Sequence, residues 1–320
     1  MSASLRPSLK IVKPGRKCAI SENLEDFLGC IEQNLSNNSR IIQRVGDGIF
    51  YIDNVLSPGE CEDLCKVVDS HASLGFWSPL GRGNEQSRMF RDADTIEIKS
   101  HTIANEIWTR LSIAIEEELR IIVANNEFDP NWERELVGTW HASSLNHDLL
   151  FAKYPPFGAF APHTDGRAIH DFNIRSFYSV IIFLNTISRG CGGGTRFYRG
   201  DAVSQLKTSI NLEGKQFWTS DPSLMNAEVD ALAGRMLIFH QALVHEGVPP
   251  LAPHCKYIIR SDVMCSRSPA LCNSTSDREA YALFQKAEDL AEEGKVEEAI
   301  PLFKRAFKLS PEMARIMGQG

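Results

Sequence analysis

His163 and Asp165 are two potential metal ligands that stand one residue apart in the run Ala-Pro-His-Thr-Asp-Gly. On an extended strand, alternate residues point to the same face, so both side chains could reach one ion. A third candidate, His245, lies far downstream in Leu-Val-His-Glu-Gly. Two histidines and one carboxylate on one face of Fe(II) leave positions open for a co-substrate and O2. The pattern predicts a non-haem iron site, with His240 as the alternative to His245.

The His-x-Asp pair is a weak signal by itself, because a chain with nine histidines often contains one by chance. A second requirement makes the prediction of an iron site more specific. If the open positions hold 2-oxoglutarate, its keto acid end chelates the metal, and its distal carboxylate needs a buried cation. Lys256 and Arg260 fall on one face of the strand that begins Lys-Tyr-Ile-Ile-Arg. A buried base there is costly without an anion, so we expect Lys256 to bind the carboxylate, with Arg260 as the alternative.

Short apolar segments separated by glycine and proline make up the middle of the chain and predict strands. Many short strands with turns between them are typical of a sandwich or jelly roll. In such a fold, a few inward polar residues can converge on one metal. The predicted strands cover residues 149–154, 176–184, 194–198, 236–239 and 257–263.

Helical patterns come before these strands. Ser57 can cap a helix that starts at Pro58 and ends near Asp69. Apolar residues recur every four positions over 102–123, which predicts one amphipathic helix packed on a larger element. Residues 75–91 are rich in Gly, Arg, Ser and Asn and predict a surface loop that could border a substrate cleft.

An ordered set of motifs resembles the Fe(II)- and 2-oxoglutarate-dependent dioxygenases of the prolyl 4-hydroxylase type over residues 48–266. The motifs are Tyr154, His163 with Asp165, Leu184-Asn185, Gly193-Gly194-Thr195-Arg196-Phe197, Gly234 to Phe239, His245 to Gly247, and Lys256. The resemblance implies an α+β fold with a mainly β core: a double-stranded β-helix with supporting amino-terminal helices.

The resemblance also implies roles for individual residues. His163, Asp165 and His245 would bind iron, and no catalytic residue is expected beyond this metal site. Lys256 would hold the distal carboxylate of 2-oxoglutarate, while Tyr154 and Thr195 would line its pocket. Where the family often has a tyrosine before Leu-Asn, this chain has Phe183, so one hydrogen bond to the cosubstrate would be absent or supplied elsewhere.

The expected reaction is hydroxylation of a protein side chain with O2 and 2-oxoglutarate as co-substrates and with ascorbate as a possible aid. Two alternatives stay open: hydroxylation of a small molecule or free amino acid, and a catalytically silent scaffold that binds partners. Fold similarity cannot choose the substrate.

The ends of the chain differ in composition from its middle. Residues 1–47 contain few large apolar groups and predict a largely disordered tail. Residues 267–320 predict a linker and two antiparallel helices around Gly294. This hairpin resembles a single tetratricopeptide repeat, or it is an ordinary helical hairpin. It should pack on the β-domain, on residues 312–320 or on another protein.

Composition limits the remaining possibilities. A net charge of -7 argues against binding nucleic acid by phosphate neutralisation. No apolar run approaches the roughly 20 residues of a membrane-spanning helix. No secretory signal follows the basic residues near the amino terminus, so we expect a cytoplasmic or nuclear protein.

Overall fold

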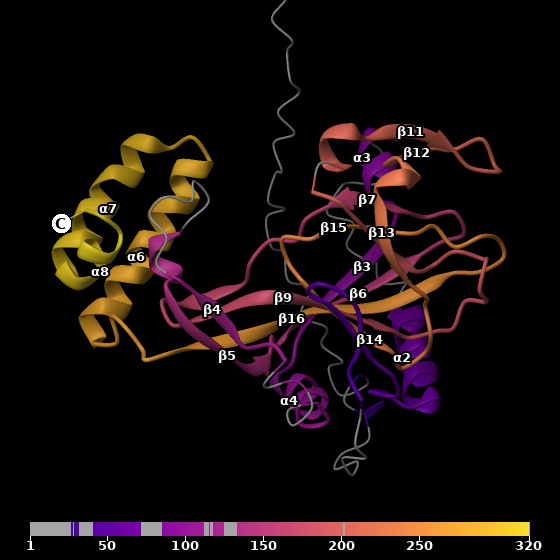
Figure 1. Ribbon diagram of the computed structural model, residues 1–320, viewed down its shortest axis with the longest axis horizontal. Helices are drawn as coiled ribbons and strands as arrows, with labels where there is room; N and C mark the ends of the chain where they lie inside the picture. The colour runs from indigo at the N-terminus through magenta and orange to yellow at the C-terminus, as the bar shows by residue number, and fades with distance from the viewer. Residues whose placement is uncertain are drawn as a thin grey trace, which may run out of the picture.

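Two facing antiparallel sheets form the centre of the computed structural model, which describes residues 27, 29–31, 41–71, 85–111, 115, 118–124, 133–200 and 202–319 (Figure 1). The large sheet has the order β1 (Gln43–Gly46), β2 (Ile49–Ile52), β14 (Met236–His240), β9 (Ile174–Phe183), β16 (Lys256–Ser268), β5 (Gly138–Leu145) and β4 (Ile121–Val123). On its flank, β6 (Asp148–Tyr154) pairs with β16 and with β3 (Asp94–Lys99), and β8 (Ile169–Asp171) pairs with β9. The small sheet has the order β13 (Met225–Val229), β10 (Thr195–Tyr198), β15 (Val244–Gly247) and β7 (Phe160–His163).

The chain passes back and forth between the two sheets, as β14, β15 and β16 show: they belong to the large, the small and again the large sheet. This topology is the predicted double-stranded β-helix, and it confirms the expected fold class. A separate hairpin, β11 (Lys207–Ile210) and β12 (Gln216–Thr219), is inserted between β10 and β13.

Alternation along the strands divides the apolar side chains between two cores. Phe183 on β9, Phe239 on β14 and Phe197 on β10 are buried between the sheets. Val180 and Ile182, also on β9, face the opposite side of the large sheet. Because β9 is covered on both faces, it reads as a nearly continuous apolar run.

Helices α2 (Pro58–His71) and α4 (His101–Thr109) cover the outer face of the large sheet (Figure 1). The predicted start of α2 is confirmed: Ser57 Oγ accepts a hydrogen bond from Glu60 N, and the Glu60 carboxylate accepts one from Ser57 N. Glu60 also forms a buried ion pair with Arg110, with 2.8 Å between Oε1 and Nη2. This pair ties α2 to the segment after α4.

The prediction of one helix over 102–123 was wrong. Helix α4 ends at Thr109, and Ile121–Val123 forms strand β4, which pairs with β5. The spacing did identify the buried side chains, because Ile107, Leu111 and Leu119 are all at most 1% exposed. Sheet pairing at the edge of β5 overrides helical spacing at the end of this segment.

The predicted loop over 75–91 is also partly helical. Residues 85–90 form α3 (Glu85–Phe90), and residues 72–84 lie outside the described part of the chain. Helix α3 contacts β7 and β12. The described part of this segment therefore lies beside the strand that carries His163.

The predicted carboxy-terminal hairpin is present as α6 (Thr275–Glu292) and α7 (Val296–Leu309), followed by α8 (Pro311–Ile316). Of the packing options, the structure shows two. Tyr281 on α6 packs edge-on against Phe172, next to β8, and Ala306 packs in the same cluster as Met313 of α8. The likeness to a tetratricopeptide repeat stays a prediction.

The amino-terminal segment is described only in part. Residues 43–46 form β1, and Phe27 is buried with its ring 5.0 Å from that of Phe151. Cys30 and Ile31 are buried in the same core, and apart from residues 27 and 29–31 the first 40 residues lie outside the described part of the chain. At the other end, β16 ends at Ser268 and α6 starts at Thr275, close to the boundary expected at 266.

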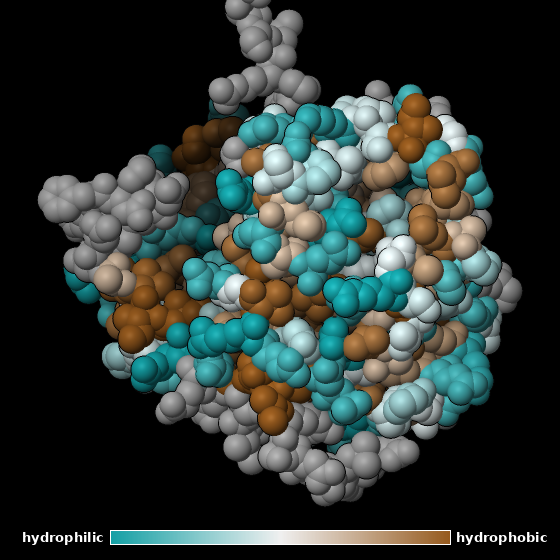
Figure 2. Space-filling model, turned by 45° about the vertical axis from the view of Figure 1, so that its right-hand side comes forward, coloured by the Kyte–Doolittle hydropathy of each residue, from teal (hydrophilic) through white to brown (hydrophobic). Residues whose placement is uncertain are grey.

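The surface seen in Figure 2 carries hydrophobic side chains in separate groups among hydrophilic ones. Within the described residues, we find no helix with the length and apolar character needed to span a membrane.

Candidate metal centre

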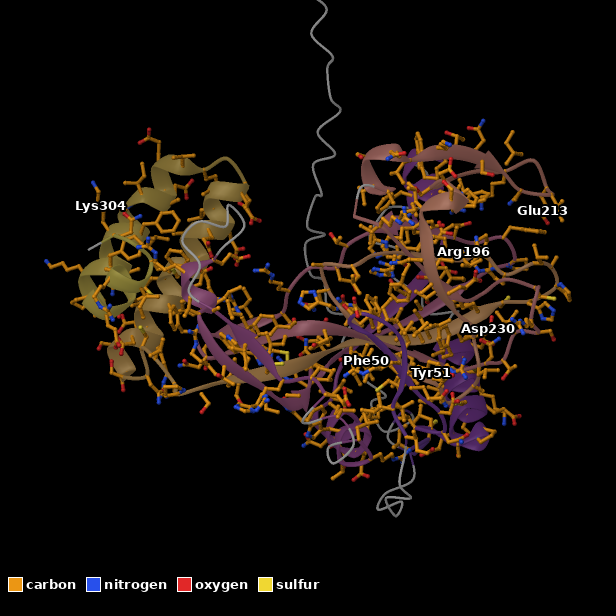
Figure 3. The ribbon with its side chains drawn as sticks, in the orientation of Figure 1. Phe50, Tyr51, Arg196, Glu213, Asp230 and Lys304 are labelled. Atoms are coloured by element: carbon orange, nitrogen blue, oxygen red, sulfur yellow. The ribbon has the colours of Figure 1, made fainter. Side chains whose placement is uncertain are left out.

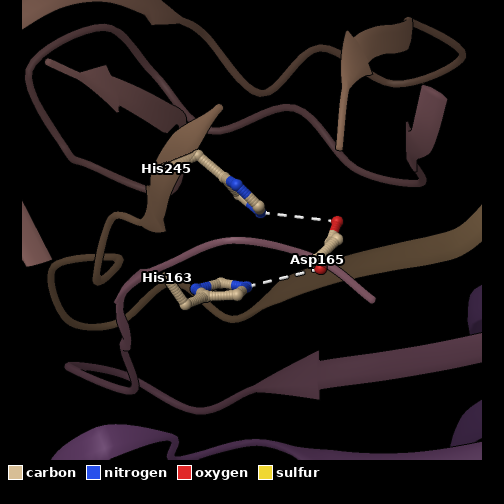
Figure 4. A group of neighbouring side chains, drawn as sticks. All are labelled: His163, Asp165 and His245. Carbon is tan, nitrogen blue, oxygen red and sulfur yellow. Dashed lines mark ion pairs between the residues drawn. The ribbon is translucent and has the colours of Figure 1, made fainter. Parts of the chain in front are cut away.

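His163, Asp165 and His245 converge between the two sheets (Figure 4). Strands β7 and β15 are neighbours in the small sheet, and their register places His163 directly opposite His245. Nε2 of His163 lies 3.6 Å from Asp165 Oδ1, and Nε2 of His245 lies 3.6 Å from Oδ2. Two atoms that bind one metal ion at about 2.1 Å are separated by about 3.0 to 3.6 Å. The spacing therefore suits three ligands of one ion better than direct hydrogen bonds.

Both imidazoles are oriented by their own backbone. Nδ1 of His163 lies 2.7 Å from Ala161 O, and Nδ1 of His245 lies 3.0 Å from Leu243 O. Because a carbonyl oxygen only accepts, each Nδ1 carries the proton, which leaves the Nε2 lone pair free for a metal. Burial lowers the pKa of His245 to about 4, so this ring is neutral at physiological pH.

Asp165 is ionised despite its position. Burial by itself would raise its pKa, but the charge of Arg260 is the main effect that opposes burial, and the pKa stays well below the usual range. Ser179 Oγ donates a hydrogen bond of 2.6 Å to Oδ2. The site thus offers two neutral imidazoles and one carboxylate, a donor set that fits Fe(II).

His240, the alternative ligand, lies elsewhere. Its ring packs edge-on against Tyr178, and its Nδ1 accepts a hydrogen bond from Ala242 N. Alternation explains the difference, because His240 ends β14 whereas His245 points inward from β15. His245 is the histidine that the structure brings to His163.

A second polar site lies beside the triad, at the start of β16. The side chain of Lys256 is buried, and Nζ donates to Gly194 O at 2.9 Å. Burial lowers the pKa of Lys256 to about 7. Thr195 is fully buried, and among the described residues its hydroxyl has no hydrogen-bond partner. An ammonium and a free hydroxyl in an apolar surrounding fit a carboxylate.

Aromatic rings enclose this anion site. Nζ of Lys256 lies 5.3 Å from the ring of Tyr154 and 5.4 Å from the ring of Phe183. Phe183, which stands where the family often has tyrosine, therefore contributes only an apolar wall. Gly194 is required for close packing, since a Cβ there would lie 2.7 Å from Val229 O. The predicted residues Tyr154, Thr195 and Lys256 are thus gathered in one place.

Arg260 was predicted as an alternative to Lys256, and its guanidinium lies elsewhere. Nη1 donates to Asp262 Oδ2 at 3.0 Å, and Nη2 is 3.6 Å from Asp165 Oδ2. The sequence reasoning did not single out Ser179. A signal for Ser179 was available, because it interrupts the apolar run of β9 with a hydroxyl.

The other side of His163 is covered by residues that the sequence also did not single out. The Phe160 ring stacks on His163 at 3.6 Å, and the Arg91 guanidinium lies 4.7 Å from the Phe160 ring. Burial raises the pKa of the Tyr154 hydroxyl, and the nearby Arg91 opposes this shift. The contact joins the end of α3 to the metal centre.

Comparisons with solved structures find many similar chains, and three of them illustrate the low sequence identity. A viral collagen prolyl hydroxylase from Paramecium Bursaria Chlorella virus-1 has 15% sequence identity and a TM-score of 0.39, and the match covers 69% of this chain and 97% of that chain. A prolyl-4-hydroxylase from Pseudomonas putida has 16% identity and a TM-score of 0.40, with 69% of this chain and 92% of that chain covered. The non-heme alpha ketoglutarate dependent epimerase SnoN of nogalamycin biosynthesis has 14% identity and a TM-score of 0.39, with 69% of this chain and 79% of that chain covered. No curated protein matches this sequence.

A family model gives the assignment. The model described as phytanoyl-CoA dioxygenase (PhyH) matches residues 45–251, well over half of the chain, and this range contains His163, Asp165 and His245. The chain therefore belongs to the phytanoyl-CoA dioxygenase family, and it is a 2-oxoglutarate-dependent dioxygenase.

Proposed function

We propose that this dioxygenase hydroxylates a protein side chain, and that His163, Asp165 and His245 hold its Fe(II). The observation that carries the proposal is the triad with a buried anion site beside it. When bound, the iron would couple O2 to the oxidation of 2-oxoglutarate to succinate and CO2, so that one oxygen atom of O2 enters succinate and the other converts a C–H bond to C–OH. No further catalytic side chain is needed, because the protein's part is to bind, orient and exclude water.

Lys256 and Thr195 are proposed to bind the distal carboxylate of 2-oxoglutarate. The buried ammonium lacks a counter-ion among the described residues, and the Thr195 hydroxyl lacks a partner there. A carboxylate would satisfy both groups at once. Tyr154 and Phe183 would exclude water from this ion pair, which strengthens it. Ascorbate would assist by keeping the iron reduced.

The β11–β12 hairpin supports a protein as the acceptor. Strand β12 contacts β7 and α3, the two elements on the His163 side of the centre. The hairpin exposes Ile210 (64%) and Leu212 (86%) near its turn, which Glu213 marks in Figure 3. Exposed apolar residues that lie together often mark a surface for another protein. A peptide docked on this hairpin would pass close to the metal, as expected for a prolyl 4-hydroxylase type of reaction.

The alternative acceptor is a small molecule or free amino acid. The family description favours it, since it refers to a CoA thioester, phytanoyl-CoA. A catalytically silent scaffold is the weakest option, because all three metal ligands are present and oriented.

A partner at the carboxy-terminal hairpin belongs to the same proposal. Helix α7 exposes Val296 (54%) and Ile300 (43%), and Lys304 of the same helix lies at the opposite end of the molecule from Glu213 in Figure 3. We propose that the hairpin recruits the target protein, and that the enzyme works in the cytoplasm or nucleus.

The test is formation of succinate from 2-oxoglutarate with Fe(II) in air, in the presence of proline-containing peptides or of acyl-CoA and free amino acids. Wild type should release succinate, and one acceptor class should increase its rate. His163→Ala should abolish turnover, whereas the matched variant His240→Ala should retain it. Absence of succinate from folded, iron-loaded wild type under every condition would refute the enzymatic function. Stimulation by small molecules alone would refute the protein acceptor.

A further inference from the structure

The two oxygens of the Asp165 carboxylate have different surroundings. Oδ2 accepts a hydrogen bond of 2.6 Å from Ser179 Oγ and lies 3.6 Å from Nη2 of Arg260. Oδ1 faces the ring of His163. Oδ2 also lies 3.6 Å from Nε2 of His245, so the donors of the large sheet hold the oxygen on the His245 side, and Oδ1, on the His163 side, receives neither of these two contacts. Binding through a single oxygen would keep positions open on the ion for 2-oxoglutarate and O2.

Arg260 owes its position to Asp262. Nη1 of Arg260 donates to Asp262 Oδ2 at 3.0 Å, and the Asp262 side chain is only 3% exposed. Gln241 Nε2 donates to Oδ1 of the same carboxylate at 2.8 Å, and Asn146 Nδ2 donates to Oδ2 at 3.3 Å. Asp262 is therefore fixed from three directions and in turn fixes the guanidinium.

The same network holds the backbone on which Asp165 stands. The Gln241 carbonyl accepts a hydrogen bond from Asp165 N at 3.1 Å. Ser176, whose hydroxyl is bonded to the Gln241 side chain, accepts one from Ala168 N at 2.8 Å. The segment after His163 is thus fastened at two amides, one bonded to the main-chain carbonyl of Gln241 and the other to the side chain of Ser176 on β9.

We infer that Arg260 and Asp262 are positioning residues for the metal-binding carboxylate of Asp165, and that Arg260 does not contact 2-oxoglutarate. The inference rests on the proposed metal role of Asp165. The charge of Asp262 is central to the arrangement. It offsets part of the charge of the guanidinium, whose Nη2 also forms a longer ion pair of 3.6 Å with Oδ2 of Asp165. Without that charge, Arg260 would turn toward Asp165 and compete with the ion.

The experiment measures the affinity of the metal-free protein for Fe(II), and for Mn(II) as a redox-stable probe, by anaerobic competition with a chelator. Asp262→Asn keeps the shape of the side chain and removes its charge. Its affinity should fall by about 10- to 100-fold, the usual effect of losing a group that orients a ligand. The matched control is Asp53→Asn, which removes the charge from another Arg–Asp pair, with Arg235, on the large sheet. The control should bind metal like wild type.

A second variant separates positioning from cosubstrate binding. The Arg260 side chain is 27% exposed, so Arg260→Gln should fold even if Asp262→Asn does not. If Arg260 positions Asp165, Arg260→Gln weakens metal binding, and the affinity for 2-oxoglutarate at saturating Mn(II) stays unchanged. Unchanged metal affinity in this variant, or a loss confined to 2-oxoglutarate, would overturn the inference. Failure of wild type itself to bind metal would instead refute the proposed function.

Discussion

Replacing Lys256 by methionine should stabilise the cosubstrate-free protein and abolish tight binding of 2-oxoglutarate. Methionine fills a similar volume without a charge. Burial lowers the pKa of Lys256 from 10.5 to about 7, and one pKa unit corresponds to about 1.4 kcal/mol. Burying the charged form therefore costs on the order of 5 kcal/mol below pH 7, and Lys256→Met should recover a part of it.

The effect on stability has a definite dependence on pH. Since the pKa of Lys256 is lower in the folded than in the unfolded protein, the cost is largest below pH 7. It declines as pH rises from about 7 to 10.5 and vanishes above that range. The advantage of Lys256→Met over wild type in free energy of unfolding should decline over the same window. Denaturant titrations at several pH values would measure it.

Binding should change in the opposite direction. Removing one partner of a buried ion pair costs about 3 to 5 kcal/mol, so the affinity for 2-oxoglutarate should fall on the order of 10² to 10³-fold. Calorimetry with Mn(II)-loaded protein would measure this, and metal affinity should be retained. Lys153→Met, on the neighbouring strand β6, is the matched control and should bind 2-oxoglutarate normally. Near-normal binding by Lys256→Met would show that the distal carboxylate lies elsewhere.

Three further predictions concern single groups. Thr195→Val removes a hydroxyl that has no partner among the described residues. The affinity for 2-oxoglutarate should therefore fall about 10-fold or more, while the free energy of unfolding is retained or rises. A parallel loss of affinity and stability would contradict the role of Thr195 in binding 2-oxoglutarate. The affinity of wild type for 2-oxoglutarate should fall as pH rises above about 7, because binding needs the protonated Lys256. Lys256→Arg should lose this dependence on pH, because arginine stays charged. If calorimetry shows that the wild-type affinity does not change with pH, the ion pair between Lys256 and 2-oxoglutarate is contradicted. Glu60→Gln breaks the buried ion pair with Arg110 and should lower the free energy of unfolding by about 3 to 5 kcal/mol in denaturant titrations. A loss near zero would mean that the attraction within the pair does not exceed the cost of removing its two charges from water.

Sequence reasoning found much of the site because its residues lie in short local patterns. His-x-Asp keeps two ligands close together along the chain, although β7 ends at His163 and Asp165 lies in the segment after it. The order of Tyr154, Thr195 and Lys256 along the chain anticipated the residues around one pocket. Burial on both faces made β9 and β14 recognisable as apolar runs.

Other features depend on which elements become neighbours. Ile121–Val123 continued a helical spacing, but it lies along the edge of β5 and became a strand. Arg260 lies on the same face of strand β16 as Lys256. The alternation of side chains along a strand does not show which anion each cation contacts. The position of Asp262 and Asp165 around Arg260 decided that question.

The sequence by itself determined which groups are available for the site: two imidazoles, one carboxylate and one lysine in an order typical of 2-oxoglutarate dioxygenases. It also determined the positions of β6, β9, β10, β14 and β16, because the residues that favour a strand are a local property of the sequence. The tertiary structure decided that His245 rather than His240 faces Asp165, that the buried Lys256 donates to Gly194 O, and that Arg260 lies 3.6 Å from the Asp165 carboxylate. These outcomes depend on register between strands that are distant in sequence, and register is fixed only when the two sheets close on a common core.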